Sequence, residues 1–123
     1  MKSGERPHSV LVVEDDDDVR AALSDVLEDE GYEVLSAGDG EQALRALRGG
    51  RELPCAILLD LWMPVMDGWQ LRRELLADAK LRQIPVIVLT AARDERTREL
   101  EAAEVLTKPV RLERLLGALA DHR

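Results

Sequence analysis

The short apolar run Ile57–Leu59, which ends in the carboxylate of Asp60, limits the fold more than any other feature of the sequence. A turn punctuated by Pro64 and Gly68 follows the run. A short unbroken apolar run between turn residues is typical of a strand that is buried on both faces, as in a parallel sheet. The run therefore predicts a parallel sheet in which Asp60 ends a strand, at the edge where ligands of open α/β sheets collect.

The rest of the chain alternates strand-like and helix-like segments. Four further segments have the composition of short strands: Val10–Val13, Glu33–Ala37, Pro85–Thr90 and Val105–Thr107. Between them, apolar residues recur at helical spacing, most weakly over Ala92–Glu104, where Leu100 is nearly alone. Five strand–helix units without a linker or a repeat predict one doubly wound α/β domain with right-handed crossovers.

Composition narrows the class of protein. The 123 residues, of which 46% are hydrophobic and 34% charged, suit one globular domain, expected over residues 9–121 after a polar leader at residues 1–8. The formal net charge of −8 argues against direct binding of this domain to nucleic acid or to an anionic membrane. Cys55 is the only cysteine, no apolar stretch reaches membrane-spanning length, and the N-terminus lacks the apolar core of a signal peptide. We therefore expect a cytoplasmic domain without an internal disulfide.

Polar residues follow four of the predicted strands at the point where each strand ends. The set comprises Glu14 and Asp15 after the first strand, Asp60 at the third, Thr90 at the fourth and Lys108 after the fifth. Because the carboxyl ends of parallel strands share one edge of a sheet, we expect all five side chains to lie there. Three crowded carboxylates repel one another unless a cation compensates them, and an oxygen-rich site of this kind suits Mg²⁺.

The same residues suit the transfer of a phosphoryl group. The Asp60 carboxylate would be the nucleophile, and its product would be an aspartyl-phosphate. The Thr90 hydroxyl and the Lys108 ammonium would contact the phosphoryl oxygens. The metal and the lysine would neutralise charge on the transferring group, while positioning of the reactants does the remaining work.

Neighbouring residues admit a second interpretation. Asp16 could replace Glu14 in the acidic pair if the first strand ran one residue longer, but Glu14 is favoured because it directly follows the apolar run. Otherwise Asp16–Asp18 are expected to form the solvated start of a helix, and Asp67 to be a helix N-cap. Two aromatic residues flank the turn after the third strand and suit either local packing or contact with a partner: Trp62 and Trp69.

Taken together and in this order, the motifs resemble the receiver domain of response regulators, in the CheY-like superfamily. The resemblance is carried by Glu14-Asp15, Asp60 before Met63-Pro64 and Asp67-Gly68, Thr90-Ala91, and Lys108-Pro109. Any one motif is weak evidence, whereas the full set, which spans residues 8 to 120, is highly specific. The resemblance implies a flavodoxin-like, five-stranded parallel sheet in the order 2-1-3-4-5, flanked by helices.

The resemblance also implies a reaction and its metal ligands. Asp60 would accept a phosphoryl group from a sensor histidine kinase or a phosphotransfer protein in a Mg²⁺-dependent reaction. Asp15 and Asp60 would bind the Mg²⁺ directly, and Glu14 would act largely through water. The backbone carbonyl of Trp62 would complete the ligands that the protein supplies.

By the same resemblance, Thr90 and Lys108 would hold the phosphoryl group, and the Lys108–Pro109 peptide bond would be cis. The chain departs from the family in two ways. The interval from Thr90 to Lys108 is a few residues shorter than usual, which predicts a short, displaced or mobile fourth helix. The position three before the lysine, often aromatic in receivers, is Val105. Because the family's switch couples the threonine to rotation of that ring, the output signal is expected to travel differently here.

The sequence thus predicts a signalling switch rather than an enzyme with a separate substrate. The domain would catalyse its own phosphorylation and dephosphorylation, and the fourth helix, fifth strand and fifth helix would contact a downstream protein or a second copy. Since no effector domain follows Arg123, the chain would act through a separate partner or be part of a longer protein. The alternative is an interaction module that keeps the fold and never uses phosphate. A phosphatase of the haloacid-dehalogenase type is disfavoured, because Trp62 replaces the second aspartate that it needs.

Overall fold

The computed structural model describes residues 8–49, 52–61, 67–91, 95–98 and 100–122. Five parallel strands form one sheet in the order β2-β1-β3-β4-β5. The strands are β1 (Ser9–Val13), β2 (Glu33–Ala37), β3 (Ala56–Asp60), β4 (Val86–Thr90) and β5 (Glu104–Thr107). This order and direction confirm the predicted doubly wound, CheY-like fold.

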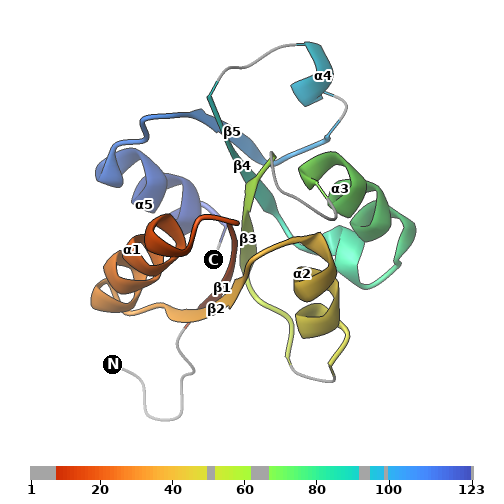
Figure 1. Ribbon diagram of the computed structural model, residues 1–123, viewed down its shortest axis with the longest axis horizontal. Coiled ribbons are helices and arrows are strands. Elements are labelled where there is room, and N and C mark those ends of the chain that lie inside the picture. The colour runs from red at the N-terminus through yellow and green to blue at the C-terminus, as the bar shows by residue number, and fades with distance from the viewer. Residues whose placement is uncertain (1–7, 50–51, 62–66, 92–94, 99, 123) are drawn as a thin grey trace.

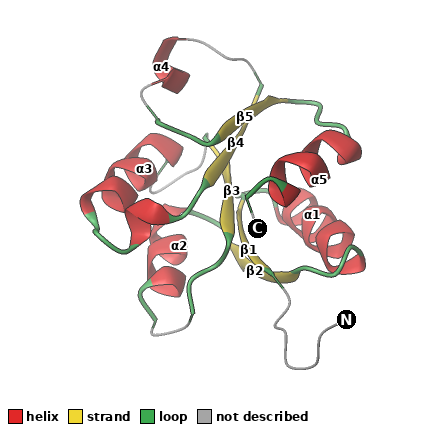
Figure 2. Cartoon of the chain, turned by 180° about the vertical axis from the view of Figure 1, so that it is seen from behind, coloured by secondary structure: helices red, strands yellow, loops and turns green. Residues whose placement is uncertain are grey.

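Helices cover both faces of the sheet. They are α1 (Asp17–Asp29), α2 (Gly40–Leu47), α3 (Gly68–Ala77), α4 (Glu95–Arg98) and α5 (Leu112–Ala120), with a short 3₁₀ turn at Leu81–Gln83. Helices α1 and α5 lie against one face, and α2 and α3 lie against the other (Figure 1). The view from behind shows the same two layers, with α4 set apart from both (Figure 2). Within the described ranges, no helix has the length and apolar character needed to cross a membrane.

The core consists of two apolar clusters, one on each face of the sheet. Successive side chains of a strand point to opposite faces, so Leu11 and Leu59 pack with α2 and α3, whereas Val12 and Leu58 pack with α1 and α5. Every residue of β3 and β4 is buried, as expected of strands covered by helices on both faces. The long apolar run before Asp60 is therefore explained by its place between two layers.

The fourth helix is short, as the interval between the fourth and fifth strands predicted. Within the described part of this segment it covers Glu95–Arg98, and Leu100 is buried in the core on the α2–α3 side. Glu101 follows with φ 51, a left-handed backbone conformation that non-glycine residues seldom adopt. Val105, at the position often aromatic in receivers, is half-buried and packs against the same core.

Candidate functional site

Three carboxylates gather at the carboxyl edge of the sheet. Strands β1 and β3 are paired side by side, with Val13 opposite Leu59, so the residues that follow them emerge together. One carboxylate oxygen from each of Glu14, Asp15 and Asp60 lies within 4.8 Å of the other two. Glu14 is 3% exposed and Asp60 7% exposed, whereas Asp15 faces solvent. The cluster is thus half enclosed and open on one side.

Lys108 places its ammonium group beside two of these acids. Its Nζ lies 3.6 Å from Asp60 Oδ1 and 3.7 Å from Glu14 Oε1. The backbone N–H of Lys108 donates to the carbonyl of Thr90 at 2.7 Å, which ties the end of β5 to the end of β4. The Lys108–Pro109 peptide bond is cis, as the resemblance implied. The amine is therefore held where it can contact an anion bound at Asp60.

Thr90 ends β4 at the same edge. Leu89 is paired with Asp60, so Thr90 extends one residue beyond the neighbouring strand, and it is buried. The structure thus brings the carboxylates, the threonine and the lysine to one edge of the sheet. Trp62, whose carbonyl was expected to be a metal ligand, lies outside the described residues.

The loop that carries the acidic pair is fixed by the N-cap of α1 and by one residue of that helix. Asp16 is the N-cap of α1, and its Oδ1 accepts from the backbone N–H groups of Asp18 at 2.9 Å and Val19 at 3.0 Å. Its carboxylate is thereby committed to the helix, so the structure favours Glu14 over Asp16 as the partner of Asp15. Arg20, which sequence reasoning missed, donates from Nη1 to the carbonyl of Glu14 at 2.8 Å.

Comparison with known proteins identifies the family. Residues 10–120 match the family model of the response regulator receiver domain. The chain belongs to this family. It is 42% identical over 121 residues to the transcriptional regulatory protein PrrA of Mycobacterium tuberculosis, a match that covers 95% of this chain and 50% of PrrA. It is 43% identical over 105 residues to the response regulator PleD of Caulobacter vibrioides, which covers 82% of this chain and 23% of PleD.

A solved structure gives the same assignment. The receiver domain of the sensor histidine kinase PA1611 of Pseudomonas aeruginosa superposes with a TM-score of 0.85 at 32% identity, covering 95% of this chain and 98% of that one. That crystal structure has a magnesium ion coordinated in the active site cleft. The present chain is thus a receiver domain of the two-component type. It spans half or less of the length of PrrA and PleD.

Burial gives one acid of the receiver domain an unusual protonation equilibrium. The pKa of Glu14 is raised from 4.5 to about 7, chiefly because burial removes its hydration. The backbone N–H of Asp16 lowers this pKa, while the neighbouring Asp60 and Asp15 contribute to raising it. At neutral pH the isolated cluster therefore holds a proton for part of the time. A set of carboxylate oxygens that carries excess negative charge in a partly buried site is what a hard divalent cation such as Mg²⁺ requires, so the residues fit that ion.

The helix after the carboxylate edge begins with a cap and a close contact. Asp67 caps α3 by accepting from the N–H of Gln70 at 2.9 Å, and Gln70 Oε1 accepts from the N–H of Asp67 at 3.0 Å. Asp67 is therefore a helix cap, as predicted, and not a member of the carboxylate cluster. The next residue, Gly68, donates to the carbonyl of Leu61 at 2.9 Å. The start of α3 is thus attached to the residue directly after Asp60. Trp69, in the first turn of α3, is buried in the core, which favours its packing role.

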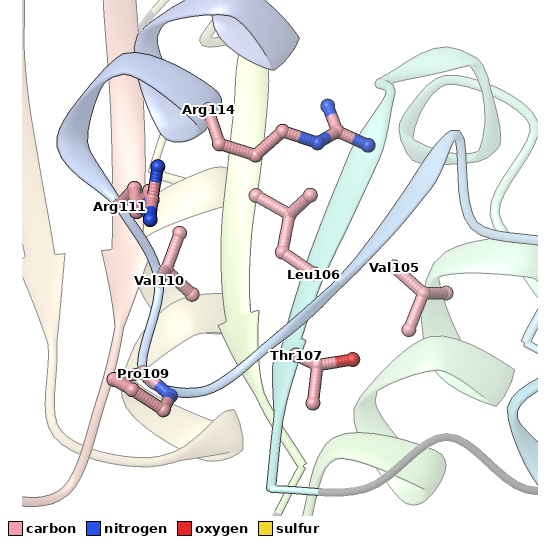
Figure 3. Close-up of a pocket in the computed structure, with 7 residues that line it drawn as sticks. All are labelled: Val105, Leu106, Thr107, Pro109, Val110, Arg111 and Arg114. Atoms are coloured by element: carbon pink, nitrogen blue, oxygen red, sulfur yellow. The ribbon is translucent and has the colours of Figure 1, made fainter.

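A cavity of about 400 Å³ opens between β5 and the start of α5 (Figure 3). Its walls are formed by Val105, Leu106, Thr107, Pro109, Val110, Arg111 and Arg114. Arg114 Nη2 lies 3.1 Å from Glu104 Oε1, which joins α5 to β5. This cavity lies on part of the surface that the sequence predicted for contact with a downstream protein.

Proposed function

We propose that Asp60 accepts a phosphoryl group from a histidine kinase or a phosphotransfer protein and that residues 9–121 act as the resulting switch. One observation carries the proposal: the Lys108 ammonium lies within 4 Å of both Asp60 and Glu14, beside the three-carboxylate cluster. An aspartate that serves only as a turn residue needs no such neighbours. The geometry supports a nucleophile with a positive group ready to contact the incoming anion.

The roles of the residues follow from their chemistry. An Asp60 oxygen would form a bond to phosphorus while the bond from phosphorus to the donor's imidazole nitrogen breaks, and the imidazole keeps the electron pair. Lys108 would hold one phosphoryl oxygen by charge, and the Thr90 hydroxyl would donate to another. Asp15, Asp60 and the carbonyl of Trp62 would hold Mg²⁺ directly, and Glu14 would act largely through water. When bound, this ion would neutralise charge on the phosphoryl group.

The same groups would serve dephosphorylation, because water can attack the phosphorus of an aspartyl-phosphate and return the Asp60 carboxylate. The proposal therefore includes an autocatalytic loss of phosphate, without a separate substrate. It also includes a cytoplasmic location, since donors of this kind are made from ATP inside the cell. The net charge of −8 supports a protein partner, either a downstream protein or a second copy, in preference to nucleic acid or membrane.

Acetyl phosphate and Mg²⁺ test the proposal directly. The chain should gain one phosphoryl group by mass spectrometry under non-acidic conditions, and excess chelator present before acetyl phosphate is added should prevent this labelling. An Asp60→Asn variant should gain none. Asp67→Asn is the matched control, because Asp67 is a nearby carboxylate that caps a helix, and this variant should be labelled like the wild type. Labelling of Asp60→Asn, or none of the wild type, would show that the proposal is wrong.

A further inference from the structure

A buried arginine joins α3 to the segment between α4 and β5. Arg72 is 5% exposed, although arginine is among the residues least often buried. Its Nε donates to the carbonyl of Leu100 at 2.5 Å, and its Nη2 donates to the carbonyl of Glu101 at 2.9 Å. Nη1 is also buried and has no hydrogen-bond partner among the described residues. Because water cannot reach this guanidinium freely, the two carbonyls cannot readily be exchanged for solvent.

The carbonyls that Arg72 contacts lie just after α4, in the segment that leads to β5. The backbone N–H groups of Leu100 and Glu101 donate back to the carbonyls of Thr97 and Arg98, at 3.3 Å each. The side chain of Leu100 lies in the core, and the hydrogen bond that its carbonyl accepts from Arg72 is buried as well. Glu101 adopts φ 51. A buried carbonyl needs a donor, and Arg72 supplies one to each of these two residues.

The other end of this connection reaches the carboxylate edge. Arg72 lies one helical turn after Gly68 on α3. Gly68 is held by a hydrogen bond to Leu61, the residue directly after Asp60. An added Cβ at Gly68 would lie 2.7 Å from the Cα of Leu61, so the start of α3 packs directly against the backbone that follows β3. The exit of β3 is thus connected to the segment before β5 in three steps. Gly68 contacts Leu61, one helical turn leads from Gly68 to Arg72, and Arg72 binds the carbonyls described above.

We propose that Arg72 is a positioning residue that transmits phosphorylation of Asp60 through α3 to Leu100 and Glu101. The inference rests on the proposed phosphorylation and deepens it by naming a route toward α4 and β5, part of the surface that the sequence predicted for contact with a partner. Position 105 carries no aromatic ring for Thr90 to engage, whereas the contacts of Arg72 connect the same two regions. A displacement at the exit of β3 would move α3, and the guanidinium would carry the two carbonyls with it.

Backbone amides provide local reporters for this route. The N–H of Gly68 reports the exit of β3, while those of Leu100 and Glu101 report the far end. Their NMR shifts and exchange rates would be measured with Mg²⁺ alone and with Mg²⁺ plus beryllofluoride, which mimics an aspartyl-phosphate. The wild type should respond at both ends. Arg73→Met is the matched control, because Arg73 is the adjacent, exposed arginine on α3, and this variant should respond like the wild type.

The Arg72→Met variant separates the two ends. Gly68 should still shift on addition of beryllofluoride, while the response at Leu100 and Glu101 should disappear. Exchange at these two amides should already be at least about tenfold faster at rest, because methionine removes both charged hydrogen bonds that hold this segment. Arg72→Lys keeps the charge and can reach one carbonyl, so it should retain a reduced response. A merely structural arginine would raise exchange at rest without uncoupling the two ends.

The outcomes are distinguishable. A full response at Leu100 and Glu101 in Arg72→Met would overturn the route and leave phosphorylation of Asp60 intact. If Arg72→Met does not fold, a full wild-type response in Arg72→Lys would overturn it equally. No phosphate on the wild type and no shift at Gly68 would remove both the proposed function and the inference that rests on it.

Discussion

Replacing Gly68 with alanine tests how tightly the start of α3 packs on the exit of β3. The new Cβ would lie 2.7 Å from the Cα of Leu61, 2.8 Å from its Cδ2 and 3.0 Å from the carbonyl oxygen of Asp60. The nearest obstacle is backbone, which cannot rotate away, and Leu61 is fully buried. Overpacking of this kind costs roughly 1–3 kcal/mol, and the better helix propensity of alanine returns at most about 1 kcal/mol. We expect a net loss of about 1–2 kcal/mol.

Urea unfolding followed by tryptophan fluorescence measures this loss. With a slope of about 2 kcal/mol per molar urea, the midpoint should fall by about 0.5–1 M. Gly117→Ala in α5 is the matched control, because an added Cβ there meets nothing within 4 Å. That variant should gain about 0.5–1 kcal/mol from helix propensity alone. A midpoint for Gly68→Ala equal to or above that of the wild type would refute the steric argument.

Two further predictions concern a titrating acid and a backbone conformation. Since the pKa of Glu14 is raised from 4.5 to about 7, its contribution to stability is full below about pH 4.5 and is lost as the pH rises through about 7. The unfolding free energy of the metal-free wild type, relative to Glu14→Gln, should decline across that window, and a flat difference would contradict the assigned pKa. Gly31→Ala should lose about 1 kcal/mol in the same urea assay despite open space around it, because its φ of 94 disfavours a side chain. Equal stability of that variant would mean that the turn relaxes at no cost.

Much of the fold could be predicted from local sequence patterns. The run before Asp60 is apolar throughout because both of its faces are buried, and the turn residues around each strand limit its length. Once the strands are known to be parallel, their carboxyl ends must share an edge, so residues as distant as Glu14 and Lys108 meet without any local signal linking them. The order of the strands, in contrast, came from the resemblance to a family and not from periodicity.

Arg72 shows where local patterns stop. It follows Leu71 and reads as an ordinary surface arginine, although it shares a helix face with Trp69 and Leu75, three residues to either side. That spacing was a usable signal of burial. Its acceptors were not predictable, because the carbonyl of Leu100 lies 28 residues away and its position depends on where α4 ends. Tertiary packing sets that end, since the segment itself has little apolar periodicity.

The charges at the carboxylate edge favour the binding of a cation in addition to the lysine. With all three acids ionised, the Lys108 ammonium offsets one of them and leaves two negative charges in excess. In the absence of a metal, the raised pKa of Glu14 relieves part of that excess by retaining a proton. A divalent cation would offset the whole of it, so its binding should release protons near neutral pH. Because Glu14 and Asp60 are both buried, solvent screens the repulsion between them only weakly. The same weak screening strengthens the attraction of the two carboxylates for a small cation.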